Sequence, residues 1–354
     1  MTHHTDDLAD YGWTPFFQSQ VGIDEFDATL PVRVLAVHRG GLDVAQPAFS
    51  GRIATLDGPD DEDRPTVGDW LLLDRTTHMP RRLLDRTSVF KRKAAGSDRR
   101  VQLIAANVDT LFVMSSCNQD FNPARIERYL ALAHEAEVTP LLVLTKADLA
   151  DDVDDYRHRA GALSPGLLVE TLDARDPHAA ETLLPWCGRG QTVALVGSSG
   201  VGKSTLVNTL TGQDVQDTKG IREDDAKGRH TTTGRSMHRL SAGSWLVDTP
   251  GMRELQLADV AAGVDGVFED VVSLTRSCRF TDCRHETEPG CAVRAAIDDG
   301  SLDPDRLRRY RKLQAQDAFN SSTLAERRAR GRAFGRMVKD LMKHKRALSD
   351  PGLD

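Results

Sequence analysis

The sequence predicts an α/β protein built from three parts, and three observations support this prediction. Residues 31–95 contain short apolar runs broken by Gly, Pro and Asp, a pattern typical of a small OB-like β-barrel. Residues 100–272 alternate apolar strands with helical segments, which indicates a doubly wound parallel sheet covered by helices. Residues 273–354 combine a Cys/His cluster with a basic segment, so we expect a metal-binding, mostly helical module there.

The bulk composition is typical of a soluble globular protein with more than one domain. The chain has 354 residues, more than one ordinary hydrophobic core needs, and 39% of them are apolar and 28% are charged. No stretch reaches the roughly 18 consecutive apolar residues of a membrane helix, and the N-terminus is acidic and polar. We therefore expect a cytoplasmic, monomeric protein without membrane contact.

The two segments before the predicted sheet differ in character. We expect residues 1–30 to form a loosely ordered arm with Trp13, Phe16 and Phe17 as anchors. Basic residues gather at the end of the barrel segment, and they form either a solvated face or a surface that binds the nucleic-acid backbone. These residues are Arg81, Arg82, Arg86, Lys91, Arg92, Lys93, Arg99 and Arg100.

A glycine-rich loop follows one of the predicted strands. The segment GSSGVGKST contains G-x-x-x-x-G-K-S, and it lies between the apolar run TVALV and a segment of helical period. The glycines let backbone N–H groups face phosphate oxygens, and the helix N-terminus adds its dipole. This context argues against a glycine turn with a chance lysine. The residues expected to bind a nucleotide here are Gly197, Ser198, Ser199, Gly200, Val201, Gly202, Lys203, Ser204 and Thr205.

Two further motifs complete the expected phosphate site. Asp248 and Gly251 form D-x-x-G after an apolar strand, which suits a carboxylate linked to Mg²⁺ through water and an amide that contacts the γ-phosphate. Ser204 is expected to ligate the same Mg²⁺. The polar segment GRHTTT supplies a threonine to the ion, and we assign Thr232, with Thr231 as the alternative. A plain threonine-rich loop is the other interpretation of this segment.

The base is expected to be recognised by Thr145, Lys146, Ala147 and Asp148. In an [N/T]-K-x-D loop the Asp carboxylate accepts hydrogen bonds from the ring N–H and the exocyclic amine of guanine, and adenine offers no such pair of donors. The usual first residue is Asn, and a threonine hydroxyl replaces only part of its bonding. Asp173 and Ala174 follow the next predicted strand. They occupy the place of the last guanine-contacting element of GTPases, which is usually Ser-Ala.

The C-terminal cluster has the spacing of a metal site. Cys278, Cys283, His285 and Cys291 follow the pattern C-x4-C-x-H-x5-C, and three thiolates with one imidazole suit a structural Zn²⁺. The alternative is a set of unrelated core cysteines with a nearby histidine. A closed tetrahedral shell leaves no open position, so we expect no catalysis by this metal.

The order of the motifs indicates a circular permutation, because the base-reading loop precedes the phosphate loop and the D-x-x-G motif comes last. The phrases QLIAANVD (102–109), LTKADL (144–149), GSSGVGKST, GRHTTT and VDTPG resemble the RsgA (YjeQ) family of bacterial ribosome-assembly GTPases. The resemblance covers roughly residues 30–320 and implies a permuted P-loop GTPase domain, a zinc site, and a GTPase that acts on the 30S subunit and its 16S rRNA. Thr145 and Asp173 depart from the family pattern.

The expected reaction is GTP hydrolysis to GDP and phosphate, in which Lys203 and Mg²⁺ offset the charge on the phosphates. Many GTPases orient the water with a Gln after D-x-x-G, but this chain has Met252 there. His230 is the best substitute, as in the resembled family, and the other interpretation is that it is only a loop residue, with Arg229 or Arg253 supplying charge instead. We expect slow intrinsic turnover that the 30S subunit accelerates during late assembly.

Two other functions stay open at this point. A P-loop ATPase or kinase would use the same loop, although Asp148 favours guanine. A GTP-regulated RNA-binding adaptor would need almost no catalysis. The basic tail is either a helix packed on the body or an rRNA-binding arm. Its basic residues are Arg306, Arg308, Arg309, Arg311, Lys312, Arg327, Arg328, Arg330, Arg332, Arg336, Lys339, Lys343, Lys345 and Arg346.

Overall fold

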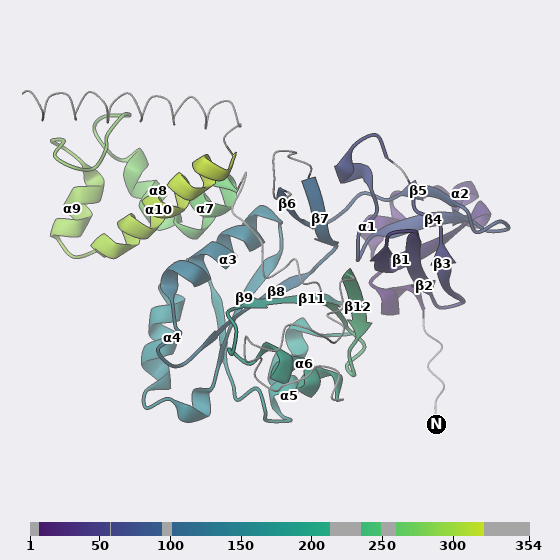
Figure 1. Cartoon of the computed structure of the whole chain (residues 1–354). Coiled ribbons are helices and arrows are strands. Elements are labelled where there is room, and N and C mark those ends of the chain that lie inside the picture. Colours follow the sequence, from purple (N-terminus) through teal and green to yellow (C-terminus); the bar gives the residue numbers. More distant parts are fainter. Residues whose placement is uncertain (1–6, 57, 94–100, 213–234, 249–259, 322–354) are drawn as a thin grey trace, which may run out of the picture.

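The computed structural model describes residues 7–56, 58–93, 101–212, 235–248 and 260–321. These residues form a β-barrel module, a central sheet with helices on both faces, and a helical module, as the sequence predicts (Figure 1). No described helix has the length and apolar character needed to cross a membrane.

The barrel module contains five strands that pair in the order β3-β2-β1-β4-β5. Because successive side chains of a strand point to opposite faces, β4 is buried on both sides. Leu71 and Leu73 pack into the barrel core, whereas Trp70 and Leu72 pack against the N-terminal segment. The strands are β1 (Thr29–His38), β2 (Gly41–Gln46), β3 (Phe49–Ile53), β4 (Trp70–Asp74) and β5 (Pro80–Leu83).

The N-terminal segment, which we expected to be loosely ordered, forms short helices where the structure describes it. These are η1 (Leu8–Tyr11), α1 (Pro15–Gln18) and α2 (Ile23–Ala28). The Trp13 ring meets Trp70 edge-on at a centroid distance of 4.8 Å, and Phe17 is buried beside it. Phe16 is exposed and is no anchor. The outer face of β4 therefore orders this segment by burying its aromatic rings.

The central sheet has the strand order β10-β9-β8-β11-β13-β12. The first five strands are parallel, and β12 is antiparallel to β13. Parallel neighbours place their C-terminal ends at one edge, where ligands bind in such sheets. The strands are β8 (Thr110–Ser116), β9 (Thr139–Thr145), β10 (Leu168–Thr171), β11 (Thr192–Gly197), β12 (Arg235–Arg239) and β13 (Trp245–Asp248).

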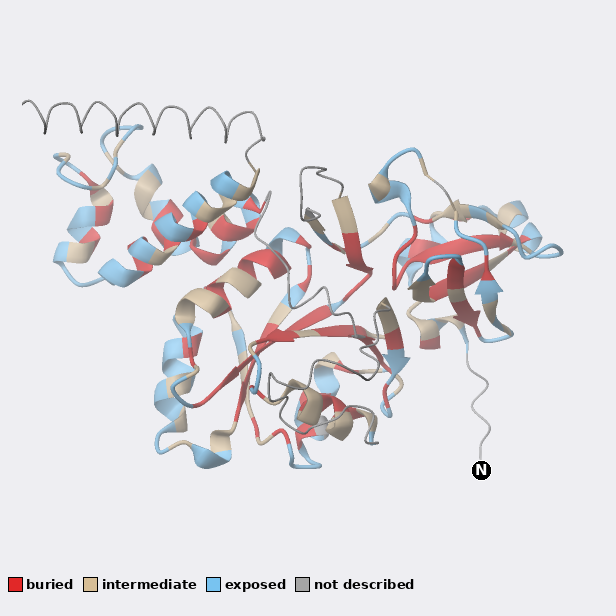
Figure 2. Cartoon of the chain, viewed as in Figure 1, coloured by how far each residue is buried: buried red, intermediate tan, exposed pale blue. Residues whose placement is uncertain are grey.

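Helices cover both faces of this sheet, which is why its inner strands β8 and β11 are almost entirely buried, whereas the edge strands β10 and β12 are partly exposed (Figure 2). Leu111 and Val113 of β8 pack toward α3 and α4, whereas Phe112 and Met114 of the same strand pack toward α5 and α6. The helices are α3 (Pro123–Glu135), η3 (Ala147–Leu149), α4 (Val153–Gly161), α5 (Ala179–Leu183), η4 (Leu184–Trp186) and α6 (Lys203–Thr211).

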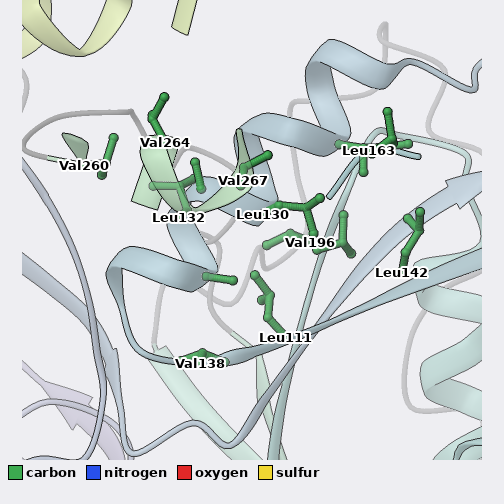
Figure 3. Packing of buried hydrophobic residues seen from close by; sticks show 14 of the residues in the cluster. Leu111, Leu130, Leu132, Val138, Leu142, Leu163, Val196, Val260, Val264 and Val267 are labelled. Atoms are coloured by element: carbon green, nitrogen blue, oxygen red, sulfur yellow. The ribbon is translucent and has the colours of Figure 1, made fainter. Parts of the chain in front are cut away.

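The helical module packs on α3 of the central domain (Figure 3). Gly263 lies against the backbone of α3, where an added Cβ atom would come within 2.1 Å of the carbonyl oxygen of Ala131. Val264 and Val267 then reach the core that contains Leu130. The module consists of α7 (Ala261–Val267), α8 (Glu269–Arg276), α9 (Ala292–Asp298) and α10 (Pro304–Ser321). The boundary expected at residue 272 falls within α8.

The barrel joins the central domain through two connections. A two-stranded ribbon of β6 (Val89–Lys93) and β7 (Val101–Ala106) links them along the chain. In addition, β1 pairs with β12, so that the hydrogen-bonded sheet continues from one domain into the other. The barrel is therefore fixed to the strand that precedes β13.

Candidate nucleotide and metal sites

The phosphate loop connects β11 to α6 at the C-terminal edge of the sheet. Gly200 and Gly202 have φ angles of 78° and 93°, which lie in the left-handed region that glycine adopts at low cost. Lys203 is the first residue of α6, and its Nζ donates to the carbonyl oxygen of Gly197 at 2.8 Å and to that of Ser198. Ser204 and Thr205 follow in the first turn. This strand, loop and helix N-terminus form a cradle suited to an anion.

Thr145 links residues 145–148, the predicted base-reading loop, to the predicted phosphate loop. Its side chain is fully buried, and its Oγ1 donates to the carbonyl oxygen of Val201 at 2.6 Å and lies 3.1 Å from that of Ser115. The threonine thus makes one contact to the phosphate loop. Lys146 follows with a left-handed φ of 57°, and Ala147 and Asp148 then lie in η3.

The loop after β10 also lies beside the phosphate loop. Thr209 of α6 donates from Oγ1 to the carbonyl oxygen of Ala174 at 2.7 Å. A Cβ atom at Gly202 would lie 3.5 Å from the Ala174 side chain. Asp173 and Asp148 both accept hydrogen bonds from Arg175. The structure therefore brings three sequence-predicted elements together, namely residues 145–148, 173–174 and 197–205.

Asp120 is a polar residue of this site that the sequence analysis missed. It lies between β8 and α3, and its carboxylate accepts a hydrogen bond from the Ser198 hydroxyl and another from Arg125 at 3.0 Å. Burial alone would raise the pKa of Asp120, but these hydrogen bonds outweigh it and hold that pKa below its ordinary value. The sequence did offer one signal for Asp120, namely its position after a strand of the parallel sheet, where ligands bind.

Several predicted site residues lie outside the described residues. These are the catalytic candidate His230, Thr231 and Thr232 of the polar segment, and Gly251. Asp248 is the last residue of β13, which runs parallel to β11 directly beside it. The backbone of Asp248 therefore reaches the same edge of the sheet as the phosphate loop. The structure does not describe the Asp248 side chain.

The Cys/His cluster is assembled as the spacing predicts. The Nδ1 atom of His285 lies 3.5 Å from the Sγ of Cys278 and 3.4 Å from the Sγ of Cys291. The ligand atoms of these three residues and Cys283 all lie within 4.8 Å of one another. Cys291 caps the N-terminus of α9, where its Sγ accepts from the backbone N–H of Arg294. Three thiolates and one imidazole at such distances fit a tetrahedral metal ion.

Three of the basic residues at the end of the barrel segment contact acidic partners. Arg81 pairs with Asp74, Arg82 with Glu25 at 2.8 Å, and Lys91 with Glu62 at 3.1 Å.

Arg86 pairs with the fully buried Asp69 at 2.8 Å, and burial raises the pKa of that carboxyl despite the arginine. Arg86 is therefore held in a mostly buried ion pair, whereas Arg81, Arg82 and Lys91 stay 39–50% exposed, so both interpretations of the basic cluster stay predictions. Arg92 bonds to Gln102, whereas Arg99, Arg100 and the Lys93 side chain lie outside the described residues.

The basic helix α10 is divided between packing and exposure. Arg306 is buried and contacts Glu127 of α3 at 2.8 Å and Asp270 of α8 at 2.9 Å. Arg309 contacts the same Glu127 at 2.9 Å. These two cations hold the helix on the body rather than facing a partner. Arg308, Arg311 and Lys312 are exposed, and the basic residues from 327 onward lie outside the described residues.

Comparisons with known proteins agree with this arrangement. Residues 83–258 match the family described as RsgA GTPase. The small ribosomal subunit biogenesis GTPase RsgA 2 of Vibrio parahaemolyticus is 54% identical over 339 residues, which cover 96% of this chain and 94% of that protein. The small ribosomal subunit biogenesis GTPase RsgA of Mesorhizobium japonicum is 50% identical over 325 residues, 91% of this chain and 93% of that protein.

Two solved structures share the fold. YjeQ from Thermotoga maritima superposes with a TM-score of 0.59 at 23% identity, covering 80% of this chain and 97% of that one. YloQ, described as a circularly permuted GTPase, gives a TM-score of 0.58 at 20% identity, with coverages of 83% and 96%. The permuted order inferred from the motifs is therefore also found in a protein of this fold.

Proposed function

This chain belongs to the RsgA GTPase family, and on that premise we propose that it binds the small ribosomal subunit, acts in its late assembly, and hydrolyses GTP to GDP and phosphate. The observation that carries the proposal is the identity of 54% to such a GTPase over nearly the whole chain. The convergence of residues 145–148, 173–174 and 197–205 at one sheet edge supports it independently.

The phosphate loop provides the cradle for the triphosphate. Its backbone N–H groups and the N-terminus of α6 stabilise negative charge, and the Lys203 ammonium offsets the charge that develops on the β and γ phosphates. Ser204, Asp248 and Thr232 are the residues that would hold Mg²⁺, which supplies charge neutralisation at the phosphate oxygens when bound. The Gly251 amide would contact the γ-phosphate.

Guanine selection is assigned to Asp148, whose carboxylate accepts from the ring N–H and the exocyclic amine. The Lys146 stem would pack over the base, and the backbone N–H of Ala174 would donate to the base oxygen. Thr145 holds this loop on the phosphate loop through Val201, so that the base and phosphate contacts share one rigid frame. We assign the positioning of the attacking water to His230, because Met252 cannot perform it.

The Cys278, Cys283, His285 and Cys291 cluster would hold one Zn²⁺ with a structural role. Binding to the 30S subunit and its 16S rRNA would use exposed cations such as Arg308, Arg311 and Lys312, which lie outside the buried network around Glu127, although Arg308 pairs with Asp305 and Arg311 donates to the Arg284 carbonyl oxygen. We place the protein in the cytoplasm, acting as a monomer.

The test is GTP turnover and co-sedimentation with purified 30S and 50S subunits in parallel. We expect 30S subunits to raise turnover on the order of tenfold or more, because a partner that orders the catalytic group removes the main deficit of the isolated enzyme. Co-sedimentation should require GTP or a non-hydrolysable analogue and should weaken with GDP. Equal turnover with either subunit, or with none, would contradict the proposal.

A further inference from the structure

The carboxylate assigned to guanine recognition has a protein partner of its own. The Nη2 atom of Arg175 donates to Oδ2 of Asp148 at 2.7 Å. Asp148 follows β9, and Arg175 follows β10, so the contact joins two loops that are 27 residues apart in the chain. A hydrogen bond at this length between charged groups restricts where the carboxylate points.

Arg175 is itself held by a fork on its neighbour Asp173. Its Nε donates to Oδ1 of Asp173 at 3.1 Å, and its Nη2 donates to Oδ2 at 3.0 Å. The backbone N–H of Arg175 also donates to Oδ1 at 3.0 Å. The hydrogen bond from the Arg175 side chain, followed by the backbone one, lowers the pKa of Asp173. The fork fixes the guanidinium so that the second N–H of the same Nη2 atom reaches Asp148.

The two carboxylates at this place favour a cation between them. The carboxylate oxygens of Asp148 and Asp173 contact the same nitrogen atom, so they lie within about 6 Å of each other. Two carboxylates at that separation repel, and each favours turning away from the other. An ionised Asp173 is acceptor-only, so it cannot donate a hydrogen bond to Asp148, whereas a hydroxyl has a proton to donate.

We propose that Arg175 is a positioning residue for guanine recognition, which orients the Asp148 carboxylate and cancels the charge of Asp173. This inference rests on the proposed function, because it assumes that Asp148 accepts from the base. The contact occupies one lone pair of Oδ2, and a carboxylate has about four acceptor sites, so both guanine donors still find acceptors. Arg175 thereby compensates for the departure from Ser at position 173.

The test compares the nucleotide affinities of the wild type and five full-length variants by titration with GDP, IDP and ADP. Arg175→Ala should weaken GDP binding about twofold to fivefold, the range for losing an ion pair whose arginine is 65% exposed. IDP lacks the exocyclic amine and has fewer bonds to lose, so the preference for GDP over IDP should fall. Arg175→Lys should be intermediate, because an ammonium cannot form the fork.

The double variant Arg175→Ala with Asp173→Ser is the decisive rescue, since it removes the repelling carboxylate and supplies a hydroxyl donor. We expect it to restore GDP affinity to within about twofold of the wild type. Arg52→Ala is the matched control, because Arg52 makes a similar exposed fork on Asp43 in the barrel, and it should leave GDP binding unchanged.

Three outcomes would overturn the inference. The first is unchanged GDP affinity in Arg175→Ala, and the second is tighter GDP binding in that variant, which would make Arg175 a competitor of the base. The third is that adding Asp173→Ser to Arg175→Ala does not restore GDP affinity. Failure of the proposed function gives a different result, because the wild type would then bind GDP and ADP equally. If Asp148→Asn loses the guanine preference but Arg175→Ala binds GDP with wild-type affinity, the role of Asp148 stands and only the role of Arg175 is rejected.

Discussion

The guanidinium of Arg33 donates to the hydroxyl of Thr192 at 2.8 Å, across the boundary between the barrel and the central sheet. Arg33 is 1% exposed, and it also donates to the carbonyl oxygens of Gly68, Tyr11 and Asn107. Burial lowers the pKa of Arg33 to about 10, which leaves it charged at neutral pH. One cation thus binds the N-terminal segment, the barrel, the linker and β11 together.

Arg33→Met should destabilise the protein by about 2–4 kcal/mol, because a side chain of similar length leaves several buried acceptors without donors. The free energy of unfolding in urea measures this loss. Thr192→Val removes one of the four partners and should cost about 1 kcal/mol. If Arg33→Met and the wild type have the same midpoint of urea unfolding, the buried contacts of Arg33 add no net stability.

His230→Ala should lower the 30S-stimulated turnover about a hundredfold, because it removes the group that positions the attacking water. GDP affinity should stay within about twofold, since no phosphate or base contact is lost. His238→Ala is the matched control, because His238 is an exposed histidine of the adjacent β12. Wild-type turnover in His230→Ala would exclude this role for His230 and would favour charge supplied by Arg229 or Arg253.

Acid should weaken the contact between Asp10 and Arg189. The side-chain hydrogen bond from Arg189 lowers the pKa of the Asp10 carboxyl to about 2, from an ordinary value of 3.8. A carboxyl with a depressed pKa stabilises the fold above its unfolded pKa, and this stability is lost as the pH falls from about 4 toward 2. Arg189 is 49% exposed, so we expect a contribution of only about 1 kcal/mol.

The measurement for Asp10 is the free energy of unfolding of the wild type minus that of Asp10→Asn, followed from pH 6 downward. The difference should favour the wild type at pH 6 and shrink below pH 4. A difference that is constant over this range would mean that the carboxylate charge makes no contribution.

Metal removal should act on the helical module and spare nucleotide binding. Purified protein should carry one Zn²⁺ per chain by atomic spectroscopy, and Cys283→Ser should lose it. The helical module of the variant should unfold at a lower temperature, whereas GDP affinity should persist, because the residues of the phosphate loop come from other elements. Full zinc content in Cys283→Ser would remove that residue from the ligand set.

The parts that sequence could predict are local in the chain. The phosphate loop, residues 145–148 and the Cys/His cluster each lie within one short segment, and the spacing of each segment determines its geometry. The missed contacts join distant positions. Arg306 meets Glu127 at a separation of 179 residues, and Arg33 meets Thr192 at 159.

The same reason explains the basic patches. A run of arginines in the sequence gives no information about which carboxylates will contact it. The partner of Arg82 is Glu25, which is 57 residues away in the chain, so the sequence alone could not show that Arg82 is paired. The replacement of the usual Ser by Asp173 likewise has a structural explanation only through Arg175, which donates a hydrogen bond to Asp148.

The pairing of β1 with β12 has a consequence for how the chain can be divided. Ala36 and Val37 pair with Ser236 and Arg235, so β1 covers part of what would otherwise be the free edge of the central sheet. Unpaired N–H and C=O groups on a sheet edge recruit strands from other molecules. A fragment that begins after residue 95 would expose this edge, and we expect it to self-associate where the whole chain stays monodisperse.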